Sequence, residues 1–413
     1  MNRYQEIVGR ANWWLFLVVV ALLPFPQAPL RLASVLWIVS WFIEGRWLSR
    51  PQALSKNKMA IPFILFGLWY GLQILSYCWS PDVKAWDWLM ERYMTFGLLV
   101  PVGIWGLNHF YDWRKAGKVL VISCIAVIPI YIVILTALYF HHELVNYFTW
   151  SEAWDFNYPT WLEFASVNVS ILKHRLFFCS VEFFGIVIAS QVYKDKKWLV
   201  VLLIAIMLSS LVLTESRQSV LTAAGLMAVG LVCELPRRYR LRYGVGILLF
   251  GMIIGGGALK LHPRMQEFDV SDITEMRTIS EDHDVRLNIW GVALQKPTDY
   301  LFPGLGAGQS TNYMIRYFEK HGMNYYAYKR YHPHNQYLEV LMENGIIGLL
   351  LFVLAWLSTC LYSRGRGRIT AVLLTTIFCM NMLTDCMFGK FCGIGLWAVG
   401  MLLITLQSKE SSV

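Results

Sequence analysis

Residues 332–361 read HPHNQYLEVLMENGIIGLLLFVLAWLSTCL, a polar stretch that runs directly into an apolar one. Residues 337–361 are long enough to cross about 30 Å of hydrocarbon as a helix, and they are almost wholly apolar from Ile346 onward. His332 and His334 stand just before that helix, so we expect the pair at a boundary between membrane and water. The stretch predicts a membrane-spanning helix with titratable side chains at its entrance.

The composition places the rest of the chain in a membrane as well. Of 413 residues, 56% are hydrophobic and 15% are charged, whereas soluble domains carry about 25% charged residues. Many apolar runs have the length that crosses a bilayer as a helix. We therefore predict an all-α polytopic membrane protein with about twelve transmembrane helices, at residues 11–28, 30–45, 59–79, 90–109, 119–140, 176–193, 198–213, 218–235, 243–261, 337–361, 369–386 and 391–407.

The net charge of +9 comes largely from cations that cluster in alternate short connectors. An excess of Lys and Arg marks cytoplasmic connectors, so the charge orients the chain and does not indicate a nucleic-acid partner. Placing every basic connector in the cytoplasm also puts both termini there. The clusters are Arg46, Arg50, Lys56 and Lys58; Arg114, Lys115 and Lys118; Lys194, Lys196 and Lys197; Arg237, Arg238, Arg240 and Arg242; and Arg364, Arg366 and Arg368.

Two connectors on the outer side are long. Residues 141–175 are rich in aromatic side chains, and residues 262–335 are long enough for a small extramembrane subdomain. We divide the chain accordingly into transmembrane helices at 1–261, the subdomain at 262–335 and transmembrane helices at 336–413. The charges of the subdomain nearly balance, so orientation does not explain its cations.

Local patterns predict one helix in the subdomain. Asp284 is a suitable N-cap for a helix that runs from Val285 to Gln295. Its apolar residues near one face are Leu287, Trp290 and Leu294.

Two further patterns in the subdomain have two interpretations each. The run Gly304-Leu305-Gly306-Ala307-Gly308 is compatible with a phosphate-cradling loop, but neither a strand nor a Lys-Ser/Thr pair accompanies it. We favour a flexible turn. The second pattern is a group of four tyrosines, Tyr325, Tyr326, Tyr328 and Tyr331. They are compatible with an aromatic belt at the membrane interface or with a platform on which sugars stack, and we favour the belt.

Two arginines are candidates for binding an anion. Arg217 lies in an outer turn before the eighth span, where the positive-inside rule disfavours a cation; an ion pair with Glu215 or snorkelling is the structural alternative. Arg286 follows the N-cap of the subdomain helix, where a cation opposes the helix dipole. A bound anion offsets that cost, as does a salt bridge to Asp282 or Asp284.

The histidine pair supplies a candidate base. Asn335 can cap the helix that enters the membrane, and the positive end of that helix disfavours a charged imidazole. His334 is then neutral near pH 7 and able to accept a proton, while His332 shares this work or holds the turn. The alternative is that both are interfacial polar residues. Second candidates are Glu182 and Asp385, in or near apolar spans, which pair with a histidine or arginine or are wetted.

We expect no metal site. A His-x-His pair is compatible with zinc, but no third ligand stands at a diagnostic spacing from His332 and His334. The 8 cysteines lie in or beside predicted spans and form no CxxC pair. Neither a metal cluster nor a disulfide framework is therefore expected.

Several local patterns occur in the order typical of one bacterial family. They are TESR at 214–217, DVRLNIW at 284–290, PGLGAG at 303–308, HPHNQYL at 332–338 and ENGIIG at 343–348. On these residues the second half of the chain resembles the bacterial O-antigen ligase and O-antigen polymerase superfamily. The first half agrees with that superfamily only in hydropathy.

The resemblance implies a GT-C-like glycosyltransferase that works without a metal, nucleotide or other cofactor and inverts the anomeric centre. Its donor would be O-antigen polysaccharide on undecaprenyl diphosphate, and its acceptor a sugar hydroxyl of the lipid A-core oligosaccharide. The family's essential arginines and histidine fall by motif on Arg217, Arg286 and His334. We add His332 and Asn335 as substrate-binding candidates. The implied location is the bacterial inner membrane, among membrane lipids, with the active site facing the periplasm.

The resemblance leaves the acceptor open. Ligases and polymerases share donor chemistry and differ in the acceptor, and the compact length, single large loop and twelve predicted spans favour a ligase. An alternative of another class is a flippase for lipid-linked oligosaccharide. Transporters tend to show repeated halves and interrupted helices, whereas the polar residues of this chain concentrate outside its spans.

Overall fold

The computed structural model describes residues 3–45, 58–140, 161–214, 216–260 and 285–410. Every regular element within these residues is a helix, so the predicted all-α class is confirmed for this part of the chain. The α-helices are α1 (Arg3–Leu22), α2 (Gln27–Glu44), α3 (Ala60–Leu75), α4 (Val83–Trp105), α5 (Trp113–Phe140), α7 (Trp161–Leu172), α8 (Arg175–Val192), α9 (Lys197–Thr214), α10 (Arg217–Glu234), α11 (Arg237–Lys260), α12 (Val285–Ala293), α13 (Gln309–Lys320), α14 (Asn324–Tyr328), α15 (Gln336–Tyr362), α16 (Gly365–Met382) and α17 (Phe391–Glu410).

Among the described residues, six helices are long and apolar enough to cross a membrane. They are α1, α3 with the short 3-10 helix Ser76–Cys78 that follows it, α5, α8, α15 and α17. Helices also occupy the other six predicted spans, as α2, α4, α9, α10, α11 and α16. Large apolar side chains on the outer faces of the long helices are exposed, as lipid contact requires. Examples are Ile122 and Val133 of α5, at 60% and 67%, and Leu350 of α15, at 54%. A polytopic membrane protein is confirmed, while twelve crossings and a GT-C-like fold remain predictions.

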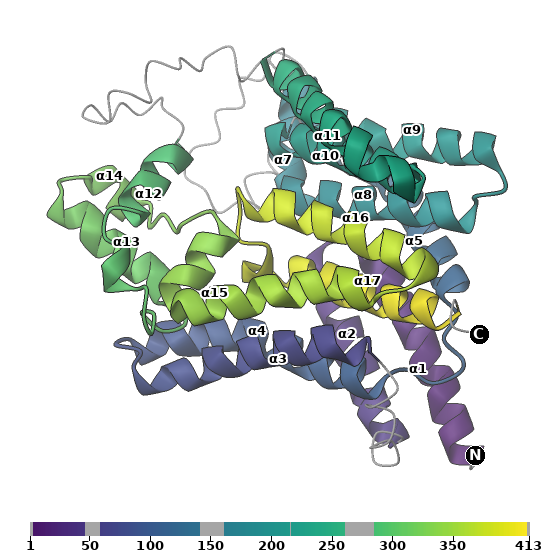
Figure 1. Ribbon diagram of the computed structural model, residues 1–413, viewed down its shortest axis with the longest axis horizontal. Helices are drawn as coiled ribbons and strands as arrows, with labels where there is room; N and C mark the ends of the chain where they lie inside the picture. Colours follow the sequence, from purple (N-terminus) through teal and green to yellow (C-terminus); the bar gives the residue numbers. More distant parts are fainter. Residues whose placement is uncertain (1–2, 46–57, 141–160, 215, 261–284, 411–413) are drawn as a thin grey trace.

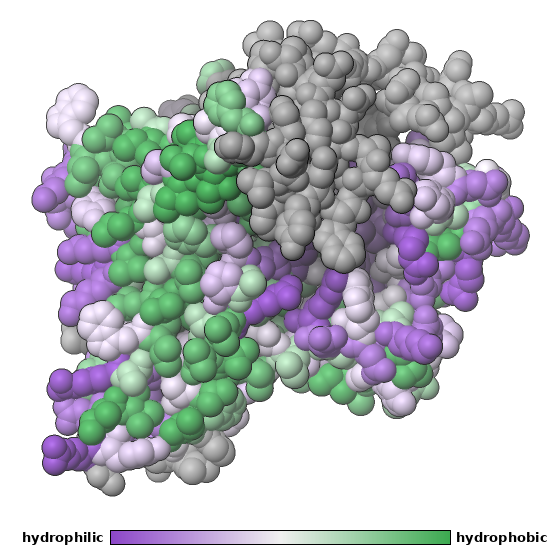
Figure 2. Space-filling view, turned by 180° about the vertical axis from the view of Figure 1, so that it is seen from behind, coloured by the Kyte–Doolittle hydropathy of each residue, from purple (hydrophilic) through white to green (hydrophobic). Residues whose placement is uncertain are grey.

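The long helices pack side by side, and α12, α13 and α14 lie together at one end, which we call the subdomain end (Figure 1). Both termini of the chain lie toward the opposite end. Because most connectors are short, successive helices alternate in direction, and α2, α4, α8, α10, α15 and α17 begin toward the subdomain end. Hydrophilic residues gather over the subdomain end, and hydrophobic residues cover much of the bundle (Figure 2).

The helix α17 lies at the centre of the bundle, and 94% of its apolar window is buried inside the protein. Trp397 stacks on Phe96 of α4 with ring centroids 4.3 Å apart, and it meets Phe66 of α3 edge-on at 5.1 Å. Neighbouring helices therefore surround the start of α17. They fix the preceding residues 383–390, which we call the α16–α17 connector and which include the 3-10 helix Met387–Gly389.

A break in α15 joins the subdomain to the bundle. Gly345 has a φ of 63° and interrupts the helix, and the Ile346 amide instead donates to the Leu301 carbonyl at 2.9 Å. The Gly306 amide donates to the Glu343 carbonyl at 2.9 Å. A Cβ atom on any of the three glycines of the run 304–308 would meet a neighbouring residue too closely. The run is thus a packed junction that requires glycine, which corrects the expectation of a flexible turn.

The predicted subdomain helix exists, and Trp290 of its predicted apolar face packs against the subdomain core, but Leu294 does not. The helix α12 ends at Ala293, and Leu294 is 54% exposed. Packing against α13, rather than periodicity alone, selects the buried face. The described residues of α12 that are buried in the subdomain core, with Met314 and Phe318 of α13, are Ile289, Val292 and Ala293. The predicted N-cap, Asp284, lies outside the described residues.

Candidate active site

His332 and His334 lie in residues 329–335 between α14 and α15, which we call the histidine loop. Their rings stack with centroids 3.8 Å apart, and His332 Nδ1 accepts a hydrogen bond from the His334 amide at 3.1 Å. His334 has a φ of 47°, a conformation uncommon for a residue other than glycine. Trp290 of α12 donates to the Pro333 carbonyl at 3.0 Å. The subdomain therefore holds the loop from one side.

Asn335 holds the histidine loop from the other side. Its Oδ1 accepts from the amides of Tyr337 and Leu338 at 3.0 and 3.1 Å, which confirms the predicted cap of α15. Its Nδ2 donates to the Leu383 carbonyl at 3.1 Å, in the α16–α17 connector. These contacts give Asn335 a structural role, and its role in binding substrate remains a prediction.

The carboxylate of Asp385 stands between two histidines. Its Oδ1 is 3.9 Å from His334 Nδ1, and its Oδ2 is 3.9 Å from His174 Nε2. The Cys386 amide donates to Oδ1 at 2.8 Å and fixes the carboxylate. Pairing of Asp385 with a histidine is confirmed, whereas the sequence interpretation missed His174. That residue directly precedes α8 within a polar Lys-His-Arg run at the entrance to a span, the same signal that marked the histidine pair.

Burial keeps these imidazoles neutral. It lowers the pKa of His334 to about 3 and the pKa of His174 to about 4, and it also lowers the pKa of His332. Asp385 opposes the shift of the His334 pKa. Burial resists ionisation of Asp385 itself, but His174 and Lys390 bring the pKa of that carboxyl below its ordinary value. A neutral His334 agrees with the sequence prediction, although burial, not the helix end, is its largest cause.

Arg286 is the second residue of α12 and is exposed. The positive charge of Arg286 lowers the pKa of His174, His332 and His334, although burial and nearer charges have larger effects on these groups. The structure therefore places Arg286 within electrostatic range of the histidine loop. Its alternative salt-bridge partners, Asp282 and Asp284, lie outside the described residues.

Arg217 is the first residue of α10 and is half-buried. The next residue, Gln218, donates to the Met380 carbonyl at 2.5 Å. This contact places the start of α10 against the end of α16, the helix that leads into the α16–α17 connector. This contact does not involve the histidine loop, so the expectation that Arg217 lies close to His334 remains a prediction. Glu215, the alternative partner of Arg217, lies outside the described residues.

The histidine loop and the connector also offer ligands for a cation. One ligand atom each from His332, His334 and Asp385 lies within 4.8 Å of the others, and the same holds for His332, Glu339 and Cys386. Asp385 is thus a third ligand that no sequence spacing revealed, because it comes from the connector before α17. The donors suit zinc. That the reaction uses no metal remains a prediction.

The four tyrosines of the subdomain do not form one surface. Tyr326 is buried with Phe318 in the subdomain core, whereas Tyr328 is 81% exposed. The ring of Tyr331 lies 6.1 Å from that of His334. Tyr326 therefore acts in packing, and Tyr331 borders the histidine loop.

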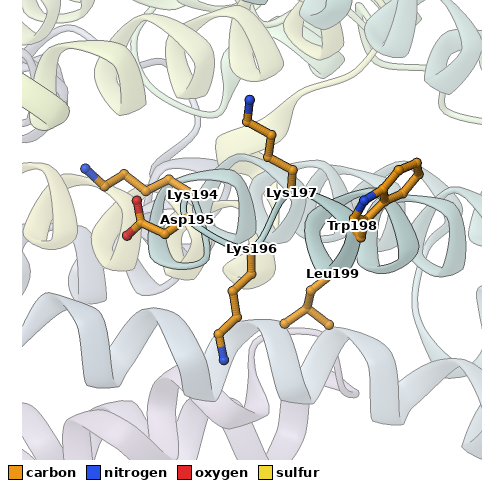
Figure 3. A pocket seen from close by; sticks show the side chains of 6 residues that line it. All are labelled: Lys194, Asp195, Lys196, Lys197, Trp198 and Leu199. Atoms are coloured by element: carbon orange, nitrogen blue, oxygen red, sulfur yellow. The ribbon is translucent and has the colours of Figure 1, made fainter.

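An open pocket of about 580 Å³ lies elsewhere, at residues 194–199 between α8 and α9 (Figure 3). Its side chains are mainly lysines with Trp198, which is 87% exposed. His174 directly precedes α8, and this pocket follows the end of that helix. A helix of this length separates the two by about 27 Å, so the pocket is not part of the histidine site.

Fold and site define a helical membrane protein whose subdomain end carries a histidine–aspartate centre among basic residues. Residues 202–353 match a family model described as O-antigen ligase. The match includes Arg217, Arg286 and the histidine loop, so this part of the chain is similar to the O-antigen ligase family. No curated protein matches the chain. His174 and Asp385 complete the site from outside the matched residues.

Proposed function

We propose that this protein is an O-antigen ligase, which moves O-antigen polysaccharide from undecaprenyl diphosphate to the lipid A-core oligosaccharide. The observation that supports this most directly is the His334–Asp385 pair with Arg286 in electrostatic range. Both substrates are lipid-anchored, so their reaction needs polar groups at a membrane interface. In this proposal the subdomain end faces the periplasm, and both termini face the cytoplasm of a bacterial inner membrane.

His334 acts as the general base. Its Nδ1 lies toward Asp385, which leaves Nε2 to accept the proton of the acceptor hydroxyl. Proton removal by a positioned base typically contributes about 10²–10⁴-fold to the rate. The Asp385 carboxylate stabilises the imidazolium that forms, in line with its effect on the pKa of His334. The stacked ring of His332 keeps the base in place.

Arg286 and Arg217 hold the diphosphate of the donor. The acceptor oxygen attacks the anomeric carbon while the bond from that carbon to the diphosphate oxygen breaks, and the electron pair of that bond leaves with the diphosphate. A guanidinium group binds two phosphate oxygens at once and stabilises the charge that grows on them. Attack and departure on opposite faces invert the anomeric centre.

The scheme uses no metal, because two arginines supply the positive charge that a divalent cation supplies in many glycosyltransferases. Treatment with EDTA should therefore leave the initial transfer rate of the purified protein unchanged. A rate that EDTA abolishes and zinc restores would instead make His332, His334 and Asp385 metal ligands.

Reconstituted transfer with defined donor and acceptor tests the proposal. A ligase converts lipid A-core into a polymer-bearing product that migrates more slowly on a gel. A polymerase lengthens lipid-linked repeats and leaves lipid A-core untouched. A flippase produces neither change. In a strain without this protein, a ligase predicts bare core with accumulated lipid-linked polymer, whereas a single repeat on the core would favour the polymerase.

A further inference from the structure

Three cations from three elements meet where the α16–α17 connector enters α17. Lys390 belongs to the connector itself. Arg92 of α4 donates to the Gly389 carbonyl at 3.1 Å, and Arg31 of α2 lies over the ring of Phe391 at 5.8 Å. These elements are far apart in the sequence, so the fold gathers the charges. We call Arg31, Arg92 and Lys390 the connector cations.

The described contacts of the connector cations are with neutral groups. Arg31 and Arg92 are close enough to repel each other, and the carboxylates in electrostatic range of Arg92 are Glu339 and Glu91. These carboxylates, and Asp385 near Lys390, offset part of the repulsion between the cations, and a bound anion would offset more of it. Arg31 also donates to the Gln27 side chain. Arg92 lies over the ring of Trp88, and Lys390 lies over the ring of Phe177.

Orientation of the chain does not account for these cations. In the predicted topology they lie at the outer ends of α2, α4 and α17, where the positive-inside rule disfavours lysine and arginine. Cations retained on that side have another use, and an intramembrane or interfacial charge is a functional candidate for this reason.

The connector cations adjoin the candidate base. Lys390 acts electrostatically on Asp385 and on all three histidines, and Arg92 acts on His332. Arg286 acts on the same histidines from α12, in the subdomain. Positive charge therefore approaches His334 from two different parts of the fold, the subdomain and the helical bundle.

We propose that the connector cations bind a phosphate group of the glycolipid acceptor. This inference rests on the proposed function, in which Arg286 and Arg217 hold the donor diphosphate and His334 stands between donor and acceptor. The second group of cations is then left for the acceptor. Arg31 lies in the first turns of α2 and Lys390 directly precedes α17. The predicted topology places these helix ends at the outer membrane surface, where the phosphates of a lipid-anchored sugar lie.

The test compares binding of lipid A-core glycolipid with binding of the same glycolipid after removal of its phosphates. The full-length protein is held in nanodiscs of zwitterionic lipid. Lys390→Gln and Arg31→Gln remove charge without removing the backbone contact made by Arg92. Each should raise the Kd for the phosphorylated glycolipid about tenfold, the size of one charge-assisted hydrogen bond, and leave the Kd for the dephosphorylated form unchanged.

Two controls separate charge from fold. Lys390→Arg should bind like the wild type, because it keeps a cation at the connector. Lys320→Gln removes an exposed cation from α13 and should change neither Kd. Equal losses for both glycolipids, or a rise only in the KM of the lipid-linked donor, would overturn the acceptor site.

Transfer is measured on the same samples. A wild type that prefers the phosphorylated glycolipid but transfers nothing would overturn the ligase function and leave the phosphate site standing. A wild type that transfers polymer equally to both glycolipids, and binds them equally, would overturn the phosphate site alone.

Discussion

Cations gather at both ends of the bundle, but their surroundings differ. The lysines at residues 194–197 are exposed around an open pocket (Figure 3). The predicted topology, which places basic connectors in the cytoplasm, accounts for them. At the subdomain end, Arg286 and Lys390 act on three half-buried histidines, and Lys390 also acts on Asp385. Positive charge alone therefore does not identify a functional site. A site needs charges that act on groups able to transfer a proton.

The largest expected effect is at the base. His334→Ala should lower the transfer rate by about 10²–10⁴-fold, the range for loss of a general base. Because alanine disfavours the positive φ of this residue, His334→Asn serves as a control that tolerates the backbone conformation. Both variants should lose transfer in the reconstituted assay and keep the folded state by circular dichroism. Full activity in either would remove His334 from the chemistry.

The next effect is at the donor. Arg286→Lys keeps the charge but loses the planar fork that binds two phosphate oxygens, so kcat should fall by about tenfold or more. Arg316→Lys, at an exposed position on α13, is the matched control and should be neutral. Initial rates at saturating donor measure the difference. An unchanged rate for Arg286→Lys would favour a structural role for this residue.

Asp385 should affect both rate and pH dependence. Asp385→Asn removes the carboxylate that stabilises the imidazolium, so the rate should fall by about tenfold. His334 has a pKa of about 3 and loses activity only when it is protonated. Activity should therefore vary little between about pH 5 and pH 8 and fall only in stronger acid. The variant should move that acid limb to lower pH, since Asp385 raises the pKa of His334. An acid limb near neutral pH would contradict this assignment.

The smallest expected effect is at the opposite end. The double change Lys196→Gln and Lys197→Gln should leave the transfer rate of correctly inserted, purified protein unchanged, because these exposed side chains lie a full helix away from the histidines. Steady-state rates would measure activity, and cysteine labelling of the connector between α8 and α9 would measure orientation separately. A loss of transfer with normal orientation would show that the two cation clusters are functionally linked.

The parts of the structure that depend on one continuous stretch could be predicted from the sequence. Apolar length located the helices, and the cap at Asn335 follows from the residues next to it. The neutral state of His334 was also predicted, but its largest cause is burial by distant parts of the fold, which the local sequence does not show. The partners of the histidine pair could not be located. Asp385 and His174 meet only because α8 and α16 pack together, and no spacing along the chain records such a contact.

The subdomain shows the same limit on a smaller scale. The helix α12 was predicted, and Trp290 packs against the subdomain core as its predicted face requires. Leu294 is exposed instead, and Ile289, Val292 and Ala293 are buried, because α13 decides which residues are covered. The glycine run was expected to be a flexible turn, since its need for glycine arises from close contacts with residues distant in the sequence. Gly304 meets the backbone of Glu343 in α15, and Gly308 meets the backbone of Ala85 in α4. In each case a partner distant in the sequence determines the outcome.

The replacement of a helical hydrogen bond in α15 by the Leu301 carbonyl has a mechanical consequence. This hydrogen bond and the bond from Gly306 to Glu343 tie residues 301–306 directly to a helix of the bundle. In the proposed function, a subdomain held in this way leaves the long polymer to enter from the side, along the bilayer surface. Local opening at Ile346 and at Gly306 should occur as one cooperative event, visible as equal rates of amide exchange.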